Sequence, residues 1–156
     1  MSASSVTDRT YAPAPMPSIF TRIIDGDLPG TFVWRDDVCV AFMSIAPIRT
    51  GHTLVVPRAE VDHWIDLEPD VNAHMMRVAQ EIARAQQAAF SPERIGLIIA
   101  GLEVPHTHLH VIPIDGMQDL DFGNADSGAS PDALGQAAAR LRAALHERDA
   151  AGVTDE

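Results

Sequence analysis

Three histidines alternate with less polar residues late in the chain, in the run His106-Thr107-His108-Leu109-His110-Val111. In a strand, successive side chains point to opposite faces, so the three imidazoles would share one face, about 6.6 Å apart. Isolated histidines in strands are usually core or rim residues. Imidazole is also the side chain that attacks electrophiles, carries protons or binds metals near neutral pH. Strict alternation therefore favours chemistry over packing.

Two kinds of chemistry fit this spacing. A three-histidine metal site needs imidazoles that converge on one ion, whereas neighbours on a flat strand splay, so a third ligand usually comes from elsewhere. In nucleophilic catalysis, a central imidazole attacks while its neighbours orient it and donate to developing charge. His108, flanked on both sides by imidazole, suits the second use.

The surrounding sequence predicts the elements that position these residues. We expect strands at 32–34, 38–42, 52–56, 96–99 and 104–114, the last of which carries the histidines. Helices are predicted at 18–24, at about 69–90, and from the capping sequence Ser130-Pro131-Asp132 onward. Consecutive strands with short connections favour an α+β domain over residues 17–148, with a largely antiparallel five-stranded sheet and two main helices. Residues 1–16 are predicted to be a flexible tail, and residues 149–156 a frayed end.

Composition narrows the classes of partner. The 156 residues carry a net charge of -11, which argues against a nucleic-acid polymer or an anionic membrane as partner but not against a small anion. The single cysteine, Cys39, lies in an apolar run and is predicted to be a buried thiol in a reducing compartment. The N-terminus lacks the apolar stretch of a signal peptide, and no segment approaches the ~20 apolar residues of a membrane span. We expect a cytoplasmic protein.

The sequence resembles the histidine-triad (HIT) family of nucleotide hydrolases and transferases. The family signature alternates three histidines with apolar residues, and positions 106–112 match it, with Thr107 only weakly apolar. The similarity extends over about residues 18–114, in the right order. Further matching segments are Ile23-Ile24-Asp25-Gly26-Asp27-Leu28-Pro29, Val40-Ala41-Phe42, Gly51-His52-Thr53-Leu54-Val55-Val56-Pro57, Ala100-Gly101, Val104-Pro105 and Pro113.

The resemblance implies a function and an assembly. It implies a homodimer whose two sheets join into one, and a nucleoside monophosphate group bound against the triad. His108 would attack the α-phosphorus to give a nucleotidyl-histidine that water resolves, with no metal or other cofactor. His106 and His110 would bind phosphate oxygens, and His52 would lie close to the triad. The residues expected around the base are Ile19, Phe20, Phe42, Ile45 and Leu54.

Several positions depart from the family pattern. Ser18 and Thr21 stand where many members have zinc-binding cysteines, so no structural zinc is predicted. A further family histidine is replaced near Glu60. Ser44 replaces a ribose-binding aspartate, which costs a charged hydrogen bond worth ~1.5–3 kcal/mol. After Gly101, Leu102 and Glu103 replace a glutamine and a small hydroxyl residue that face phosphate.

Three functions therefore compete. The first is a hydrolase that cleaves a nucleoside phosphoramidate or a related nucleotidyl bond through His108. The second, motivated by the changes at positions 44, 102 and 103, is a nucleotide-binding regulatory module with weak or no catalysis. The third is a metalloenzyme that uses the histidines as ligands.

Overall fold

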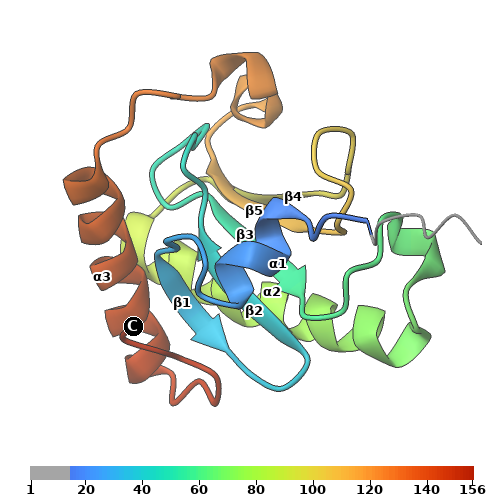
Figure 1. Ribbon diagram of the computed structural model, residues 1–156. Coiled ribbons are helices and arrows are strands. Elements are labelled where there is room, and N and C mark those ends of the chain that lie inside the picture. The colour runs from blue at the N-terminus through green and yellow to red at the C-terminus, as the bar shows by residue number, and fades with distance from the viewer. Residues whose placement is uncertain (1–14) are drawn as a thin grey trace, which may run out of the picture.

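The structure, a computed structural model, describes residues 15–156 (Figure 1). Five strands form one antiparallel sheet in the order β1-β2-β3-β5-β4. Their bounds are β1 Phe32–Arg35, β2 Cys39–Met43, β3 Thr53–Pro57, β4 Arg94–Ile98 and β5 Leu109–Ile114. The predicted α+β class with a largely antiparallel five-stranded sheet is confirmed.

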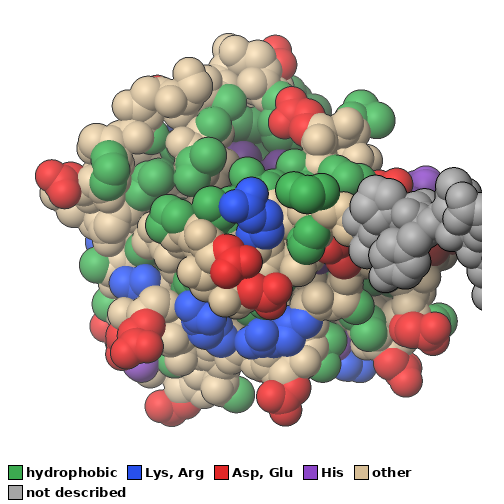
Figure 2. All heavy atoms as spheres, in the orientation of Figure 1, with side chains coloured by type: hydrophobic (Ala, Val, Ile, Leu, Met, Phe, Trp, Pro, Cys, Tyr) green, Lys and Arg blue, Asp and Glu red, His purple; other side chains and the backbone are tan. Residues whose placement is uncertain are grey.

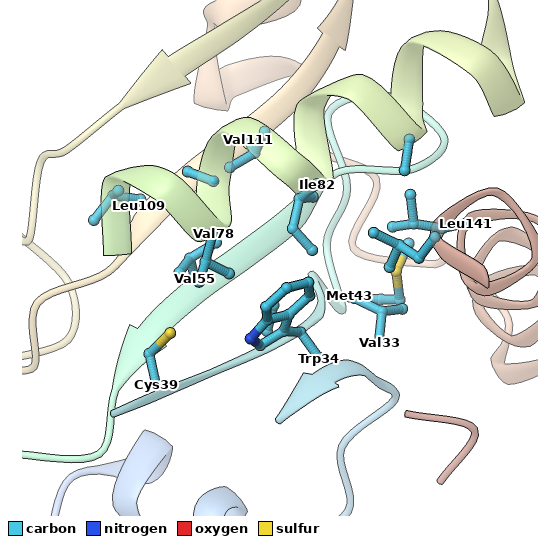
Figure 3. Close-up of a cluster of buried hydrophobic side chains, with 14 of the residues drawn as sticks. Val33, Trp34, Cys39, Met43, Val55, Val78, Ile82, Leu109, Val111 and Leu141 are labelled. Atoms are coloured by element: carbon cyan, nitrogen blue, oxygen red, sulfur yellow. The ribbon is translucent and has the colours of Figure 1, made fainter. Parts of the chain in front are cut away.

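The two faces of the sheet pack against different helices. On one face, Val55, Leu109 and Val111 pack against α2 (Pro69–Phe90), as Figure 3 shows, while α3 (Pro131–Glu147) packs against α2 and β1. On the other face, Val40, Phe42 and Leu54 pack against Phe20 of α1 (Ile19–Ile24). This alternation is the two-residue period of a strand, and since His110 of β5 pairs with Leu54 of β3, His110 lies on the α1 side of the sheet.

The helices begin where the sequence predicts. The Ser18 and Ser130 hydroxyls accept the Thr21 and Ala133 backbone N–H groups at 3.0 and 3.1 Å and cap α1 and α3. α2 begins at Pro69, and its buried residues Met75, Val78, Ile82 and Ala85 recur every three or four positions, as on one face of a helix. Within residues 15–156, no helix is both long and apolar enough to cross a lipid bilayer.

The predicted strand at 104–114 was too long, because β5 begins only at Leu109. Pro105 has no N–H to donate to a ladder. The N–H of His106 bonds to the Val104 carbonyl at 2.8 Å, and that of Thr107 bonds to the Val61 carbonyl at 2.8 Å. Of the triad, only His110 therefore lies within a strand.

The C-terminal segment, predicted to fray from residue 149, instead runs along β1. Val153 forms a bridge with Trp34, and the Arg35 N–H donates to the Gly152 carbonyl at 2.8 Å. A Cβ at position 152 would lie 2.2 Å from the Trp34 ring, so glycine permits this close approach. Of the predicted N-terminal tail, residues 1–14 lie outside the part of the chain that the structure describes. Cys39 is buried, as expected.

Candidate active site

A cleft of about 890 Å³ opens on the α1 side of the sheet. Figure 2 shows histidine side chains at the bottom of a hollow whose rim is mostly hydrophobic. The lining comes from α1, residues 29–31, the end of β2 with the turn after it, His52 and β3, the loop at 100–104, two histidines of the triad, and the segment 122–134. His52, His108 and His110 all line the cleft.

His108 is oriented by a backbone carbonyl. Its Nδ1 lies 2.7 Å from the carbonyl oxygen of His106, an acceptor, so Nδ1 carries the proton and Nε2 keeps a free lone pair. The Phe20 ring packs edge-on against the imidazole, with 4.9 Å between ring centroids. A buried, oriented imidazole with a basic nitrogen available in a cleft is the arrangement a nucleophile needs.

His106 supports His108 and does not line the cleft. Its side chain is fully buried, its Nε2 donates to the Pro57 carbonyl at 2.8 Å, and its Nδ1 accepts the Ser18 hydroxyl at 2.6 Å. Both ring nitrogens are therefore engaged within the chain. The expected contact of His106 with phosphate oxygens stays a prediction, and making it would require one of these two bonds to break.

The remaining two histidines form a short hydrogen-bonded chain. The Ile48 N–H donates to His52 Nδ1 at 3.1 Å, so the His52 proton lies on Nε2. That N–H donates to His110 Nδ1 at 2.9 Å, which leaves the His110 proton on Nε2. The backbone N–H of Ile48 therefore sets the tautomer of His110 through two successive hydrogen bonds. In that tautomer, the free ring nitrogen of His110 is a hydrogen-bond donor.

Burial keeps these imidazoles neutral. It lowers the pKa of His110 to about 3, with further lowering from His108 and His52, and it lowers the pKa of His52 to about 4. Burial also lowers the pKa of His108, although its bond to the His106 carbonyl and the nearby Glu103 carboxylate act in the opposite direction. An uncharged His108 is the form that can attack.

The residues predicted to surround the base all line the cleft. Phe20, Phe42 and Leu54 are buried at the base of α1 and pack with Phe32. Ile19 and Ile45 are 46% and 76% exposed, so they contribute to the rim. The five predicted base-pocket residues that line the cleft are Ile19, Phe20, Phe42, Ile45 and Leu54.

The substituted positions also line the cleft. The Ser44 hydroxyl accepts the Ala46 N–H at 3.3 Å, so it serves the turn after β2. Gly101 has φ of +77°, a conformation that favours glycine, and it turns the loop that carries Leu102 and Glu103. Leu102 is 94% exposed and Glu103 is also exposed.

Ser18 and Thr21, which stand where many HIT proteins have zinc-binding cysteines, form a hydrogen-bonded cluster with Glu60 beside the triad. Glu60 accepts the Ser18 N–H at 3.0 Å and the Thr21 hydroxyl at 2.5 Å, while the Ser18 hydroxyl bonds to His106. Two hydroxyl groups are poor substitutes for the thiolate ligands of a zinc site. The residues at these positions therefore do not fit a zinc ion.

Sequence reasoning missed one wall of the cleft. Phe122, in a short 3-10 helix (η3, Phe122–Asn124), packs edge-on against His110 with 4.8 Å between centroids. Arg49 holds the preceding turn through Asp115 at 2.7 Å and Asp119 at 2.5 Å. The available signal was a lone aromatic residue in an Asp- and Gly-rich loop, which by itself does not say what the ring contacts.

A second group of potential metal-binding side chains lies outside the cleft. Asp36, Cys39 and His74 have ligand atoms within 4.8 Å of one another. The Asp36 carboxylate already accepts the Trp34 ring N–H at 2.8 Å and the Val38 and Cys39 backbone N–H groups at 2.8 Å. Burial acts to raise the pKa of Asp36, but these bonds and the one to His74 together outweigh it and lower the pKa to about 2. Burial raises the pKa of Cys39 to about 12, which disfavours the thiolate that metals bind. We therefore interpret these three side chains as a hydrogen-bonded structural cluster, not as a metal site.

Comparisons with known proteins agree with this geometry. The chain is 36% identical over 102 residues to an uncharacterized HIT-like protein from Borreliella burgdorferi, covering 61% of this chain and 73% of that protein. It is 29% identical over 100 residues to the adenylylsulfatase HINT3 of Arabidopsis thaliana, covering 61% of this chain and 51% of that protein.

Among solved structures, it is similar to a zinc-bound histidine triad family protein from Mycobacterium smegmatis. The TM-score is 0.73 and the identity 31%, with 85% of this chain and 96% of that chain covered. The family model described as the HIT domain matches residues 25–117, more than half of the sequence. The chain therefore belongs to the HIT family.

Proposed function

We propose that this protein is a nucleotide hydrolase that cleaves a nucleoside phosphoramidate or a related nucleotidyl bond through His108. The single observation that carries the proposal is the bond from His108 Nδ1 to the His106 carbonyl, 2.7 Å, which leaves Nε2 as a free nucleophile in the cleft. Family membership and the adenylylsulfatase relative support chemistry at a nucleotidyl phosphorus.

The reaction has two displacement steps. In the first, the His108 Nε2 lone pair forms a bond to the α-phosphorus while the bond from phosphorus to the leaving nitrogen breaks, and the departing amine takes up a proton from solvent. In the second, a water oxygen attacks the same phosphorus and gives up a proton to solvent, the bond to Nε2 breaks, and the nucleoside monophosphate leaves. The His106 carbonyl stabilises positive charge on the imidazole ring during both steps.

His110 is proposed to bind a phosphoryl oxygen. Its Nε2–H is the donor left free by the chain from Ile48 through His52, and its lowered pKa keeps it in that neutral tautomer. A fixed donor beside the nucleophile stabilises negative charge that develops on phosphoryl oxygens. His52 acts through His110 as a positioning residue.

Turnover of adenosine phosphoramidates by the wild type and by His108→Ala tests the proposal. We expect the variant to lose at least ~10³-fold in kcat, since removal of a covalent nucleophile leaves only binding and charge stabilisation. Acid-labile radiolabel on the wild-type protein after quenching would identify the nucleotidyl-histidine. Equal turnover by both proteins would remove His108 from the mechanism.

A regulatory nucleotide-binding module is the second candidate. Two observations favour it: the Ser44 hydroxyl is used by the Ala46 N–H, and exposed Leu102 offers no donor to phosphate. Calorimetric titration with AMP and GMP separates the candidates. Clear binding without turnover of any phosphoramidate would favour the module over the hydrolase.

A metalloenzyme is the third hypothesis carried from the sequence. It would need the imidazole nitrogens to face one ion, whereas His106 and His108 each direct a ring nitrogen at a backbone carbonyl. Elemental analysis of protein purified without an affinity tag tests it directly. A stoichiometric content of zinc, iron or nickel would revive this hypothesis.

A further inference from the structure

The formal charge of the cleft lining is negative and comes from Glu103. Within residues 15–156, the lining contains no lysine or arginine, and Glu103 is its one carboxylate. Burial lowers the pKa of the histidines that line the cleft, so they add no positive charge near neutral pH. A substrate that enters the cleft therefore meets a negative potential at the loop that carries Glu103.

The position of His108 indicates which part of a substrate Glu103 would face. His108 is 5% exposed at the floor of the cleft, while Glu103 is exposed where the cleft meets solvent. In an in-line displacement, the leaving atom departs on the side of phosphorus opposite the nucleophile. With the nucleophile at the floor, the leaving group points toward the mouth, where Glu103 lies.

The rest of the mouth is apolar. Leu102, beside Glu103, is 94% exposed, Ile45 is 76% exposed and Phe122 is 41% exposed. The hydrophobic rim around the histidines in Figure 2 is consistent with these values. Such a mouth favours an aliphatic or aromatic body over a hydrated polyphosphate chain.

We propose that Glu103 is a specificity-determining residue that favours leaving groups with an apolar body and a distal cationic group, and disfavours anionic leaving groups. The inference rests on the hydrolase proposed above and names its substrate class. It predicts poor use of dinucleoside polyphosphates and adenylyl sulfate, whose leaving groups are anions. The cationic amine would pair with the carboxylate while the nucleoside occupies the apolar end of the cleft beside α1.

The test uses a matched set of adenosine phosphoramidates whose leaving amines share one alkyl chain and differ only at its far end: methyl, ammonium or carboxylate. The wild type should show kcat/KM in the order ammonium, methyl, carboxylate, with steps of roughly two- to fivefold for a solvent-exposed charge pair. Glu103→Gln should bring the three values together. Raising the ionic strength should shrink the wild-type differences by screening.

Glu147→Gln is the matched control, because Glu147 is exposed near the end of α3 and lies outside the cleft lining. It removes the same net charge and should keep the wild-type order. Equal use of the three compounds by the wild type, or an order that survives Glu103→Gln, would overturn the inference.

Binding of the same compounds to His108→Ala separates this inference from the proposed function. Affinities that rank ammonium, methyl, carboxylate and converge in the double variant with Glu103→Gln would support the role of Glu103 even if the wild type hydrolysed none of them. Affinities that show no such ranking would overturn it even if hydrolysis were rapid.

Discussion

At the residue scale, the hydrogen-bond partners of each histidine determine its chemical role. The His106 carbonyl fixes the His108 ring, and the His106 side chain is held between Pro57 and Ser18. His52 fixes the His110 ring in turn. Each of these bonds determines which nitrogen carries a proton, so each determines whether the ring attacks, donates or only supports.

The pH dependence of turnover follows from the burial of His108. Burial lowers the pKa of His108 below its ordinary value of 6.5, so the neutral, attacking form persists into acidic solution. We expect kcat/KM to fall only below pH 6.5, with an apparent pKa under that value. A pH–rate profile measured with a neutral phosphoramidate checks this, and a decline that begins above pH 6.5 would contradict it.

Ser44→Asp should strengthen nucleoside binding. A carboxylate at this cleft position accepts both ribose hydroxyls, whereas the Ser44 hydroxyl already serves the Ala46 N–H. A gain of one charged hydrogen bond corresponds to roughly tenfold tighter AMP binding by calorimetry. Ser44→Asn is the control, since an uncharged amide should gain much less. An unchanged affinity in Ser44→Asp would show that position 44 does not face the ribose.

Much of this site was predictable because its chemistry is local in sequence. The alternating histidines and the segment around His52 identify the candidate reacting groups from the sequence alone. The residues predicted from the family resemblance to bind the nucleotide all line one cleft. The role of His106 was not predictable in the same way. It depends on Pro57 and Ser18, which are 49 and 88 residues away, and spacing along the chain does not encode such contacts.

At the element scale, the loop between β5 and α3 closes one side of the cleft. Two short 3-10 helices, η2 (Met117–Leu120) and η3, fold this loop back toward His110. The Asp119 carboxylate accepts the Asp115 N–H at 2.8 Å and pairs with Arg49, so the turn is held from both sides. Short 3-10 turns lack an apolar period, so the sequence pattern does not predict η2 and η3.

Phe122→Ala should raise KM more than it lowers kcat. The ring forms part of the cleft wall and packs on His110, which is proposed to hold phosphate and does not itself react. Loss of one aromatic contact corresponds to roughly a two- to tenfold rise in KM. Met117→Ala, at a 79% exposed position of the same loop and outside the lining, should leave both constants near wild type. A selective fall in kcat would instead place Phe122 in the chemical step.

At the scale of the whole molecule, buried neutral histidines make stability depend on pH. Burial lowers the pKa of His52 to about 4 and of His110 to about 3, whereas the unfolded chain titrates near 6.5. Below pH 6.5 the unfolded state binds more protons, so the free energy of unfolding decreases as the pH falls toward 3. Asp36, whose pKa is lowered to about 2, adds a further loss below pH 3.8.

Urea denaturation between pH 7.5 and 4.5 measures this dependence. We expect the midpoint to fall steadily below about pH 6.5. His52→Gln keeps a polar side chain near His110 and removes one titrating group, so its midpoint should fall less steeply. A midpoint that stays constant across the range would contradict the assignment of neutral, buried histidines.

The edges of the sheet bear on the proposed homodimer. β4 is an edge strand with Leu97 42% exposed, so joining two sheets would use this edge. Sedimentation velocity should give twice the chain mass of 16.8 kDa for the wild type. Leu97→Lys, a charge of the kind that blocks edge pairing, should shift the protein toward the monomer. A variant that stays as dimeric as the wild type would exclude β4 as the interface.

The C-terminal residues that lie along β1 limit how far such assembly can go. Since the sheet has two edges and the bridge from Val153 to Trp34 occupies one of them, a copy that pairs through β4 presents only covered edges to the next. If two copies join through β4, growth by edge pairing would therefore stop at two chains. A chain shortened before residue 149 would expose the β1 edge, and we expect such a variant to form larger assemblies than the dimer.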